Sequence, residues 1–407
     1  MAEPKLRFKR EDGESYSDWC KDKWLNLGRF VSSGILSKAD LSEEGTPCIL
    51  YGELYTKYGE IAHTIFSKTN SSSHIFSKKD DVILPKSGET PEDISTATCI
   101  PYDDVSLGGD LIVFRHNEKV IGAFLSYLIS NRAKNAIASI AQGKSVVHIS
   151  EKGLANIELS FPCPEEQQKI ADFLSNVDEV IVQSKVEVQN LEQQKKATMQ
   201  KIFSQEVRFK REDGTEFPEW EINSLSELCD YADYRGKTPT KTQNGIFLVT
   251  AKNIKHGYID YEISKEYIAE DDYETVMHRG VPKIGDVIIT TEAPMGNVAQ
   301  IDRDKIALAQ RVIKYRGKNG LMDNDYLKQA LLSEPFQDEL DKRATGGTVK
   351  GIKGSVLHTL ILPVPCIEEQ QKIADFLSAY DEAISYAKQE LGKWKELKKG
   401  LLQQMFV

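Results

Sequence analysis

Residues 342–353, KRATGGTVKGIK, combine four basic side chains with three glycines and contain no acidic residue. Glycine lets a backbone approach a phosphate group closely, and lysine can neutralise its charge. The segment therefore predicts a contact that positions a nucleic acid, with an ordinary turn at the end of a domain as the alternative. The residues assigned to this contact are Gly347, Thr348, Lys350 and Lys353.

Two further segments, RGKTPTK (235–241) and AKNIK (251–255), carry side chains that can contact phosphates or base edges. Arginine usually pairs with guanine and asparagine with adenine. Solvated loops are the alternative interpretation. The candidates here are Arg235, Lys237, Thr238, Lys252 and Asn253.

Aromatic and basic side chains also mix in YGELYTKYGE (51–60), where Tyr51, Tyr55 and Tyr58 surround Lys57. A nucleic-acid surface can have this composition. We favour a half-buried strand, because tyrosine is enriched in strands.

Motifs of catalysis or metal binding would indicate an enzyme. GKS (143–145) is not a phosphate-binding loop, because the position that requires glycine holds Ala138. The seven histidines form no H-E-x-x-H motif, and the six cysteines form no C-x-x-C pair. We therefore expect no catalytic residue, no metal and no cofactor bound by this chain.

The chain repeats itself. RFKREDGESYSDW (7–19) returns as RFKREDGTEFPEW (208–220), and EEQQKIADFLSNVDEVI (165–181) returns as EEQQKIADFLSAYDEAI (368–384). The offsets are 201 and 203 residues, half of the 407-residue chain. Between these landmarks the two halves show little similarity. We interpret this as a shared frame that carries two diverged domains.

A weaker repeat precedes each long motif, where QGKSVVHIS (142–150) aligns with TGGTVKGIK (345–353). The first copy of the predicted nucleic-acid contact is therefore assigned to Gln142, Lys144 and Ser145. The last residues, LLQQMFV, also resemble the close of the first EEQQ segment. This circular order predicts that the two ends lie close together and that the fold has approximate two-fold symmetry.

Each EEQQ segment predicts a long helix. Pro164 and the glutamates that follow it suit a first helical turn, although the second copy has Ile367 in place of proline. Apolar residues then recur at spacings of three and four, which defines one seam along each helix. A lysine falls at the same place on both seams, Lys195 and Lys398. The apolar seam positions are Leu174, Val177, Ile181, Val188, Leu191 and Ile202, and Leu377, Tyr380, Ile384, Leu391, Trp394 and Leu401.

A helix of about 38 residues would be about 57 Å long and needs a partner for its apolar face. The other copy in an antiparallel pair is the simplest partner. A stalk between unrelated modules and a homodimerisation zipper are the alternatives. The predicted fold is α+β, with two globular α/β domains (1–163 and 206–366) separated by a long antiparallel coiled coil of two helices (164–205 and 367–407).

The net charge of −10 opposes a nucleic-acid partner unless basic residues gather locally. No stretch reaches the roughly 18 apolar residues of a membrane helix. The first residues, MAEPKLRFKRED, lack the apolar core of a signal peptide. We therefore expect a cytoplasmic protein with no membrane partner.

The repeated organisation resembles the specificity subunits of type I restriction-modification enzymes, and the resemblance spans the chain. It rests on PCPEEQQKIADFLSNVD (162–178) and PVPCIEEQQKIADFLSAYD (363–381). In the second domain it also rests on YRGKTP (234–239), TAKNI (250–254), GDVIITTEAPMGNVAQI (285–301) and AQRVI (309–313). The first domain shows no obvious counterpart of GKTP or GDVIIT.

The resemblance implies a non-catalytic subunit that binds double-stranded DNA, each target-recognition domain reading one half of a split, asymmetric site. It implies two modification (methyltransferase) subunits as partners, which bring S-adenosylmethionine. In the full complex it implies two restriction subunits that use ATP and Mg²⁺. A coiled-coil scaffold or regulatory DNA-binding protein that acts as a homodimer is the alternative function.

Overall fold

The structure, a computed structural model, describes residues 4–71, 75–143, 145–234 and 239–406. The chain forms two compact units. Unit 1 comprises Met1–Ser184 with Glu390–Val407, and unit 2 comprises Lys185–Gln389. Helices α4 (Pro164–Phe203) and α10 (Ile367–Met405) contribute to both units.

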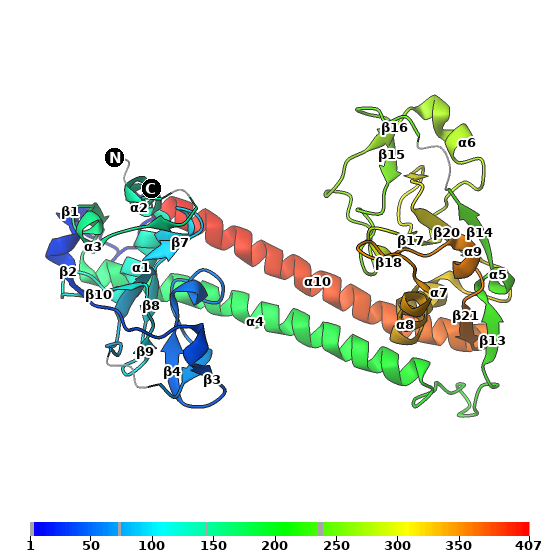
Figure 1. Ribbon diagram of the computed structural model, residues 1–407, viewed down its shortest axis with the longest axis horizontal. Coiled ribbons are helices and arrows are strands. Elements are labelled where there is room, and N and C mark those ends of the chain that lie inside the picture. Colours follow the sequence, from blue (N-terminus) through cyan, green and yellow to red (C-terminus); the bar gives the residue numbers. More distant parts are fainter. Residues whose placement is uncertain (1–3, 72–74, 144, 235–238, 407) are drawn as a thin grey trace. The chain divides into compact units, whose positions relative to one another are not determined.

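Unit 1 is built on the antiparallel sheet β2-β10-β6-β8, which α1 contacts (Figure 1). A second sheet, β3-β5-β4-β9, includes the parallel pair β4·β9, and two-stranded ladders join β1 to β12 and β7 to β11. The elements are β1 (Cys20–Lys23), β2 (Gly28–Val31), β3 (Leu41–Ser42), β4 (Thr46–Ile49), β5 (Ser67–Thr69), β6 (Asp81–Pro85), β7 (Ser87–Gly88), β8 (Thr98–Ile100), β9 (Ser106–Leu107), β10 (Leu111–His116), α1 (Gly122–Asn131), α2 (Lys134–Ile140), β11 (Val147–His148), α3 (Glu151–Leu154) and β12 (Glu158–Phe161).

Unit 2 has the same strand order in its main sheet, β14-β20-β17-β18. Its second sheet, β16-β15-β19, also contains one parallel pair, β15·β19, and a ladder joins β13 to β21. The elements are β13 (Glu221–Ser224), α5 (Leu225–Leu228), β14 (Cys229–Asp233), β15 (Ile246–Val249), β16 (Tyr267–Ile268), α6 (Tyr273–Val276), β17 (Val287–Thr291), β18 (Met295–Gln300), β19 (Ala307–Leu308), β20 (Val312–Gly317), α7 (Asn324–Leu332), α8 (Glu334–Arg343), α9 (Gly354–Leu357) and β21 (Ile361–Val364).

The central strands form because their sequences are apolar and rich in β-branched residues. All residues of β6 (DVILP) and of β17 (VIITT) are buried, as expected for strands covered on both faces. The segments with little sequence similarity between the repeats therefore fold into main sheets of the same strand order. The predicted fold class, two α/β domains with long helices, is confirmed.

The expectation that the first domain lacks a counterpart of GDVIIT is wrong, because residues 80–85 are that counterpart. Asp81 binds Arg115 at 3.1 Å as Asp286 binds Arg316 at 2.6 Å; Asp81 begins β6, and Asp286 directly precedes β17. The preceding position is left-handed in both domains, with φ of 67° at Asp80 and 87° at Gly285. Aspartate replaces the glycine there, which hides the motif in the sequence.

The two long helices pair in an antiparallel manner within each unit. In unit 1 the start of α4 and the end of α10 share one core, which contains Leu174 and Met405. In unit 2 the ion pairs Lys195–Asp381 and Glu192–Lys388 join α4 to α10. Six of the twelve predicted seam residues are buried and six are partly buried: Leu174, Val177, Ile181, Val188, Ile202 and Leu377 in the first group, and Leu191, Tyr380, Ile384, Leu391, Trp394 and Leu401 in the second.

The repeated opening motif locks onto the start of each helix. Arg7 donates to both carboxylate oxygens of Glu166 at 3.1 and 2.7 Å, and Arg208 donates to Glu369 at 3.3 and 2.8 Å. Both glutamate side chains are fully buried, so the bidentate arginine compensates the loss of hydration. The identical sequences of the repeat therefore have identical structural roles.

The ends of the chain meet in unit 1, where the N and C labels of Figure 1 lie close together. The backbone amides of Lys5 and Leu6 donate to the carbonyl of Gln404 at 2.9 and 3.1 Å. In the middle of the chain the amide of Val207 donates to the carbonyl of Lys201 at 3.2 Å. The second contact is the repeat of the first. The described helices include none long and apolar enough to cross a membrane.

Candidate nucleic-acid interface

Both copies of the glycine-containing turn form the same hairpin. In unit 1 the backbones of Gln142 and His148 exchange hydrogen bonds of 3.0 and 2.8 Å. In unit 2 Thr345 and Gly351 exchange bonds of 2.8 and 2.9 Å. The weak sequence repeat therefore marks an equal backbone structure.

One glycine in each hairpin is required by the geometry. Gly143 has φ of 134° and Gly346 has φ of 113°, which side chains rarely adopt. An added Cβ would lie 2.0 Å from the carbonyl oxygen of Val146 in the first hairpin and 2.3 Å from that of Val349 in the second. The next glycine, Gly347, has no atom within 4 Å of such a Cβ. Its role is therefore not steric.

Each hairpin is attached to the end of the central strand. The amide of Ile352 donates to the carbonyl of Thr291 at 3.0 Å, and the amide of Thr291 donates to that of Arg311 at 3.0 Å. Unit 1 has the same ladder, from Ile149 to Lys86 at 3.0 Å and from Lys86 to Asp110 at 2.7 Å. The hairpin, the central strand and the strand beside it thus form one surface in each unit, which we call the reading face.

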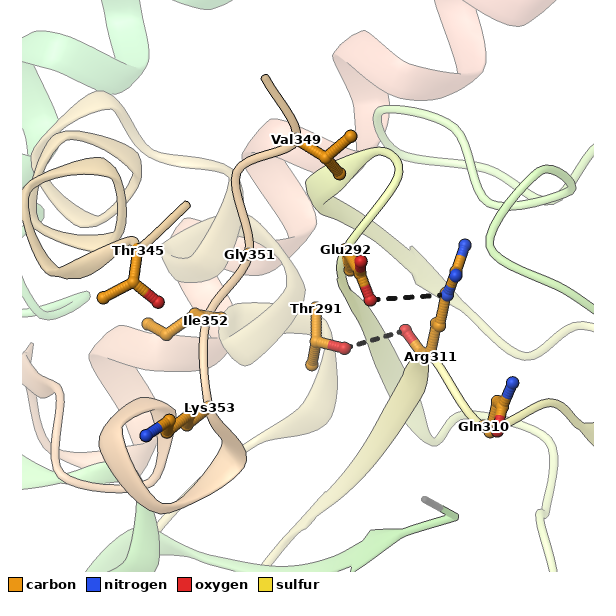
Figure 2. Close-up of a pocket in the computed structure, with 9 residues that line it drawn as sticks. All are labelled: Thr291, Glu292, Gln310, Arg311, Thr345, Val349, Gly351, Ile352 and Lys353. Atoms are coloured by element: carbon orange, nitrogen blue, oxygen red, sulfur yellow. Dashed lines mark hydrogen bonds and ion pairs between the residues drawn. The ribbon is translucent and has the colours of Figure 1, made fainter. Parts of the chain in front are cut away.

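In unit 2 the reading face contains a cleft of about 390 Å³, shown in Figure 2. Arg311 lies on one side of the cleft and its Nε is 3.4 Å from a carboxylate oxygen of Glu292. The lining residues are Thr291, Glu292, Gln310, Arg311, Thr345, Val349, Gly351, Ile352 and Lys353. Side chains that donate and accept hydrogen bonds therefore surround the cleft on a surface that a DNA groove could meet.

In unit 1 the reading face continues into a larger groove of about 760 Å³. Asp110 joins the two, since it lines the groove and accepts a hydrogen bond of 2.6 Å from Ser87 beside the hairpin. The groove is also lined by Lys38, Tyr51, Tyr55 and Lys57. The strand predicted at the tyrosines is wrong, because residues 51–53 form a short 3₁₀ helix and turns follow.

Most described candidates from the sequence lie at the surface. Gln142 and Ser145 are exposed on the first hairpin, and Gly347, Thr348 and Lys350 are exposed on the second. Lys350 is ion-paired with Asp341 at 2.8 Å, while Lys353 lines the cleft. Lys252 is exposed on a loop. Lys144, Arg235, Lys237 and Thr238 lie outside the described residues.

The prediction that Asn253 contacts a phosphate or a base is wrong. Its side chain is fully buried, and its amide oxygen accepts from the amide and hydroxyl of Thr250 at 3.0 and 2.8 Å. Its amide nitrogen donates to the carbonyls of Asp260 and Ser264 at 2.9 and 2.8 Å. These bonds hold the loop together and leave no group for a base. Asn253 is therefore a structural residue of the domain.

The sequence prediction missed Glu292 and Arg311 in unit 2 and Ser87 and Asp110 in unit 1. The segment AQRVI contains Arg311, but nothing in it shows which strand lies alongside. The alignment of the two hairpins was the available signal, because the first hairpin pairs with Ser87 and the second pairs with Glu292. Among the described residues, no group of three or more His, Cys, Asp or Glu side chains is placed to hold a metal ion.

A partly buried ion cluster joins each domain to the helix pair. In unit 1 Lys398 of α10 lies 2.7 Å from both Glu60 and Asp178. Burial opposes its charge, but the two carboxylates prevail and raise the pKa of Lys398. In addition, the hydroxyl of Tyr127 donates to Asp178 at 2.6 Å. Lys398 of α10 therefore brings together the loop that carries Glu60, helix α1 with Tyr127 and helix α4 with Asp178.

The equivalent cluster in unit 2 has the opposite balance of charge. Lys195 lies 2.6 Å and Lys328 lies 3.2 Å from Asp381, which also accepts 2.8 Å from Gln329. Burial raises the pKa of Asp381, but the two lysines outweigh it and hold that pKa below its usual value. Burial lowers the pKa of Lys195, which one shared carboxylate only partly offsets. Two cations here share one anion.

A duplicated frame whose two copies each present a polar face beside a glycine hairpin fits a protein that reads nucleic acid. The chain belongs to the family described as the type I restriction modification DNA specificity domain, which it matches over residues 30–193 and 218–393. Its role is DNA sequence specificity. Specificity subunits are not catalytic, and the catalytic activity lies in other subunits.

Relatives and solved structures agree with this assignment. The chain is 27% identical over 309 residues to the type I restriction enzyme MjaVIII specificity subunit of Methanocaldococcus jannaschii, which covers 73% of this chain and 72% of the relative. It is 25% identical over 312 residues to the putative MjaX specificity subunit of the same organism, covering 72% and 70%.

Among solved structures, the type I restriction-modification S subunit from M. genitalium superposes with a TM-score of 0.63 at 16% identity, covering 100% of this chain and 99% of that one. A chain from a study of complex assembly and conformational transition of the type I R-M system gives 0.54 at 16% identity, covering 96% and 97%. These similarities establish the fold.

Proposed function

We propose that each unit reads one half of a split, asymmetric DNA target through its reading face. The observation that carries this proposal is that equivalent positions on matching strand ladders hold different chemistry. Ser87 and Asp110 in unit 1 stand where unit 2 has Glu292 and Arg311. His148 likewise stands where unit 2 has Gly351. Two faces with different donors and acceptors favour two different base sequences.

The test of this proposal is a domain exchange. Residues 222–343 are replaced by the corresponding segment of a related specificity subunit, and the methylated sequence is mapped in cells that express the chain with its modification subunit. One half of the target should change and the other half should stay. A change in both halves, or in neither, would refute one-domain, one-half-site recognition.

We further propose that the long helices set the number of unspecified bases between the halves. Helix α4 has 40 residues, and at 1.5 Å per residue it is about 60 Å long. One DNA turn is about 34–36 Å, so a rigid element of this length can set a spacing of about that size. Removal of one heptad within residues 174–202 and of its equivalent in α10 should alter the spacer. Altered half-sites with unchanged spacing would contradict this role.

For assembly, we propose one copy of this chain with two modification subunits, which bring S-adenosylmethionine. Two restriction subunits that use ATP and Mg²⁺ would complete the complex, with no cofactor on this chain and the whole assembly in the cytoplasm. Co-expression and native mass measurement should give one copy of this chain to two modification subunits. A stable homodimer that ignores the modification subunit would favour the scaffold or regulatory alternative.

A further inference from the structure

The two reading faces differ most at one pair of residues that faces across two neighbouring strands. In unit 2 the pair is Glu292, directly after β17, and Arg311, directly before β20. In unit 1 it is Ser87, in β7 just after β6, and Asp110, directly before β10. Each pair is bonded side chain to side chain, at 3.4 Å and 2.6 Å respectively.

The strand register shows that the two pairs occupy the same place. Thr290 pairs with Val312 in unit 2, and Pro85 pairs with Leu111 in unit 1. One step further along, the backbone bond from Thr291 to Arg311 matches the bond from Lys86 to Asp110. The hairpin then joins the same strand end in both units. The two pairs therefore hold different chemistry at the same place on the ladder, and Asp110 also differs from Arg311 in having a positive φ of 57°.

Packing leaves Arg311 and Asp110 open to solvent, although Ser87 itself is buried. The Arg311 and Glu292 side chains are 48% and 46% exposed, so their ion pair contributes little to stability. Asp110 is exposed as well, and of its two oxygens Ser87 engages one in the hydrogen bonds of the described residues. In both units the partner orients a side chain that still has hydrogen-bonding capacity to offer.

One member of each pair, Arg311 in unit 2 and Asp110 in unit 1, matches a different base. Arginine donates two hydrogen bonds to the O6 and N7 atoms of guanine, whereas a carboxylate accepts from the N4 amino group of cytosine. The cleft beside Arg311 and the groove beside Asp110 leave space next to each side chain (Figure 2 for unit 2).

We propose that the cross-strand pair is a base-specificity determinant in each unit, with Arg311 reading a guanine and Asp110 reading the amino group of a cytosine. Glu292 and Ser87 are positioning residues that aim them. This inference rests on the proposed function, since it needs each unit to read its own half-site. A good bidentate contact discriminates between bases by roughly 5- to 150-fold.

The test replaces the unit 2 pair by the residue types of the unit 1 pair within the full chain. The double variant Glu292→Ser/Arg311→Asp, assembled with the modification subunit, should turn one G·C pair of the unit 2 half-site into C·G in the mapped methylation target. The unit 1 half-site should stay the same. Should this variant fail to assemble, Arg311→Gln, which keeps a long polar side chain, should shift the same position towards adenine.

Two matched variants separate base reading from phosphate binding. Asp110→Asn tolerates the φ of 57° at that position, adds a donor, and should relax one position of the unit 1 half-site only. Lys350→Ala, on the rim of the second hairpin, should weaken binding to all sequences equally and reduce the salt slope by about 1. If Arg311→Gln behaves like Lys350→Ala, Arg311 contacts phosphate and the inference is wrong.

The inference also fails if the wild-type half-site of unit 2 contains no G·C pair, or if the double variant methylates the wild-type sequence unchanged. Both outcomes leave the proposed function intact as long as exchange of residues 222–343 still changes one half-site. If that exchange changes both halves, the proposed function itself fails.

Discussion

The backbone amide of Leu6 donates to the carbonyl of Gln404 at 3.1 Å, which joins two segments from opposite ends of the sequence. The repeat of this bond, between Val207 and Lys201, lies in the link from α4 to the second opening motif. The two junctions are thus equal in structure, although one is open and the other closed.

A circular permutant should therefore fold and recognise the same target. Joining residue 406 to residue 4 by a short linker and opening the chain between 204 and 207 reverses the two junctions. Thermal unfolding and methylation mapping of the permutant should match the parent chain closely. A permutant that folds but methylates a different sequence would show that the junctions are not equivalent.

Lys398 and Lys195 occupy the same repeat position, but their removal should have unequal effects. Lys398→Met leaves the partly buried Glu60 and Asp178 beside each other without a cation, which should cost about 1–3 kcal/mol. Lys195→Met leaves Asp381 bound by Lys328 and Gln329 and should cost about 1 kcal/mol or less. Urea unfolding of both variants measures the difference. Equal losses would show that the charge balance of the clusters is unimportant.

Acidic pH should lower the free energy of unfolding, because Asp381 of unit 2 becomes protonated. The folded-state pKa of this group is below its ordinary value of 3.8, because Lys195 and Lys328 outweigh the effect of burial. Its contribution to stability is therefore fully present above the ordinary value and is lost as the pH falls through the folded pKa. The free energy of unfolding of wild type should fall more steeply below about pH 4 than that of Asp381→Asn. Parallel curves would contradict this assignment.

Substitution by alanine should have different effects on stability at two neighbouring glycines of the second hairpin. Gly346→Ala forces a side chain into left-handed backbone and against the Val349 carbonyl, which should cost about 1–3 kcal/mol and weaken DNA binding. Gly347→Ala meets no atom within 4 Å and should leave stability unchanged. Thermal unfolding with DNA titration distinguishes them. If Gly347→Ala weakens only binding, the backbone at Gly347 lies against the phosphate.

Much of the architecture could be predicted from the sequence, because the repeat carries it. Identical segments had to make identical contacts, as Arg7–Glu166 and Arg208–Glu369 do. The paired hairpins were also visible, since Gly143 and Gly346 align. These features depend on local geometry that a few residue types encode.

The chemistry of the reading face could not be predicted, because it depends on strand register. Glu292 and Arg311 are brought together by pairing between β17 and β20, which no spacing in the sequence reveals. The prediction that Asn253 contacts a base was wrong for a related reason. A loop asparagine looks available until the fold shows that four hydrogen bonds within its own loop already use its amide.

The composition of unit 1 has a consequence for synthesis. Its core includes Met405 and Phe406, and Phe406 packs against Trp19 and Phe124. All of unit 2, residues Lys185–Gln389, is translated between the two parts of unit 1. A growing chain can therefore complete its second unit while the first still exposes apolar surface. The first 184 residues are therefore expected to complete their core only after residues 390–406 have been made.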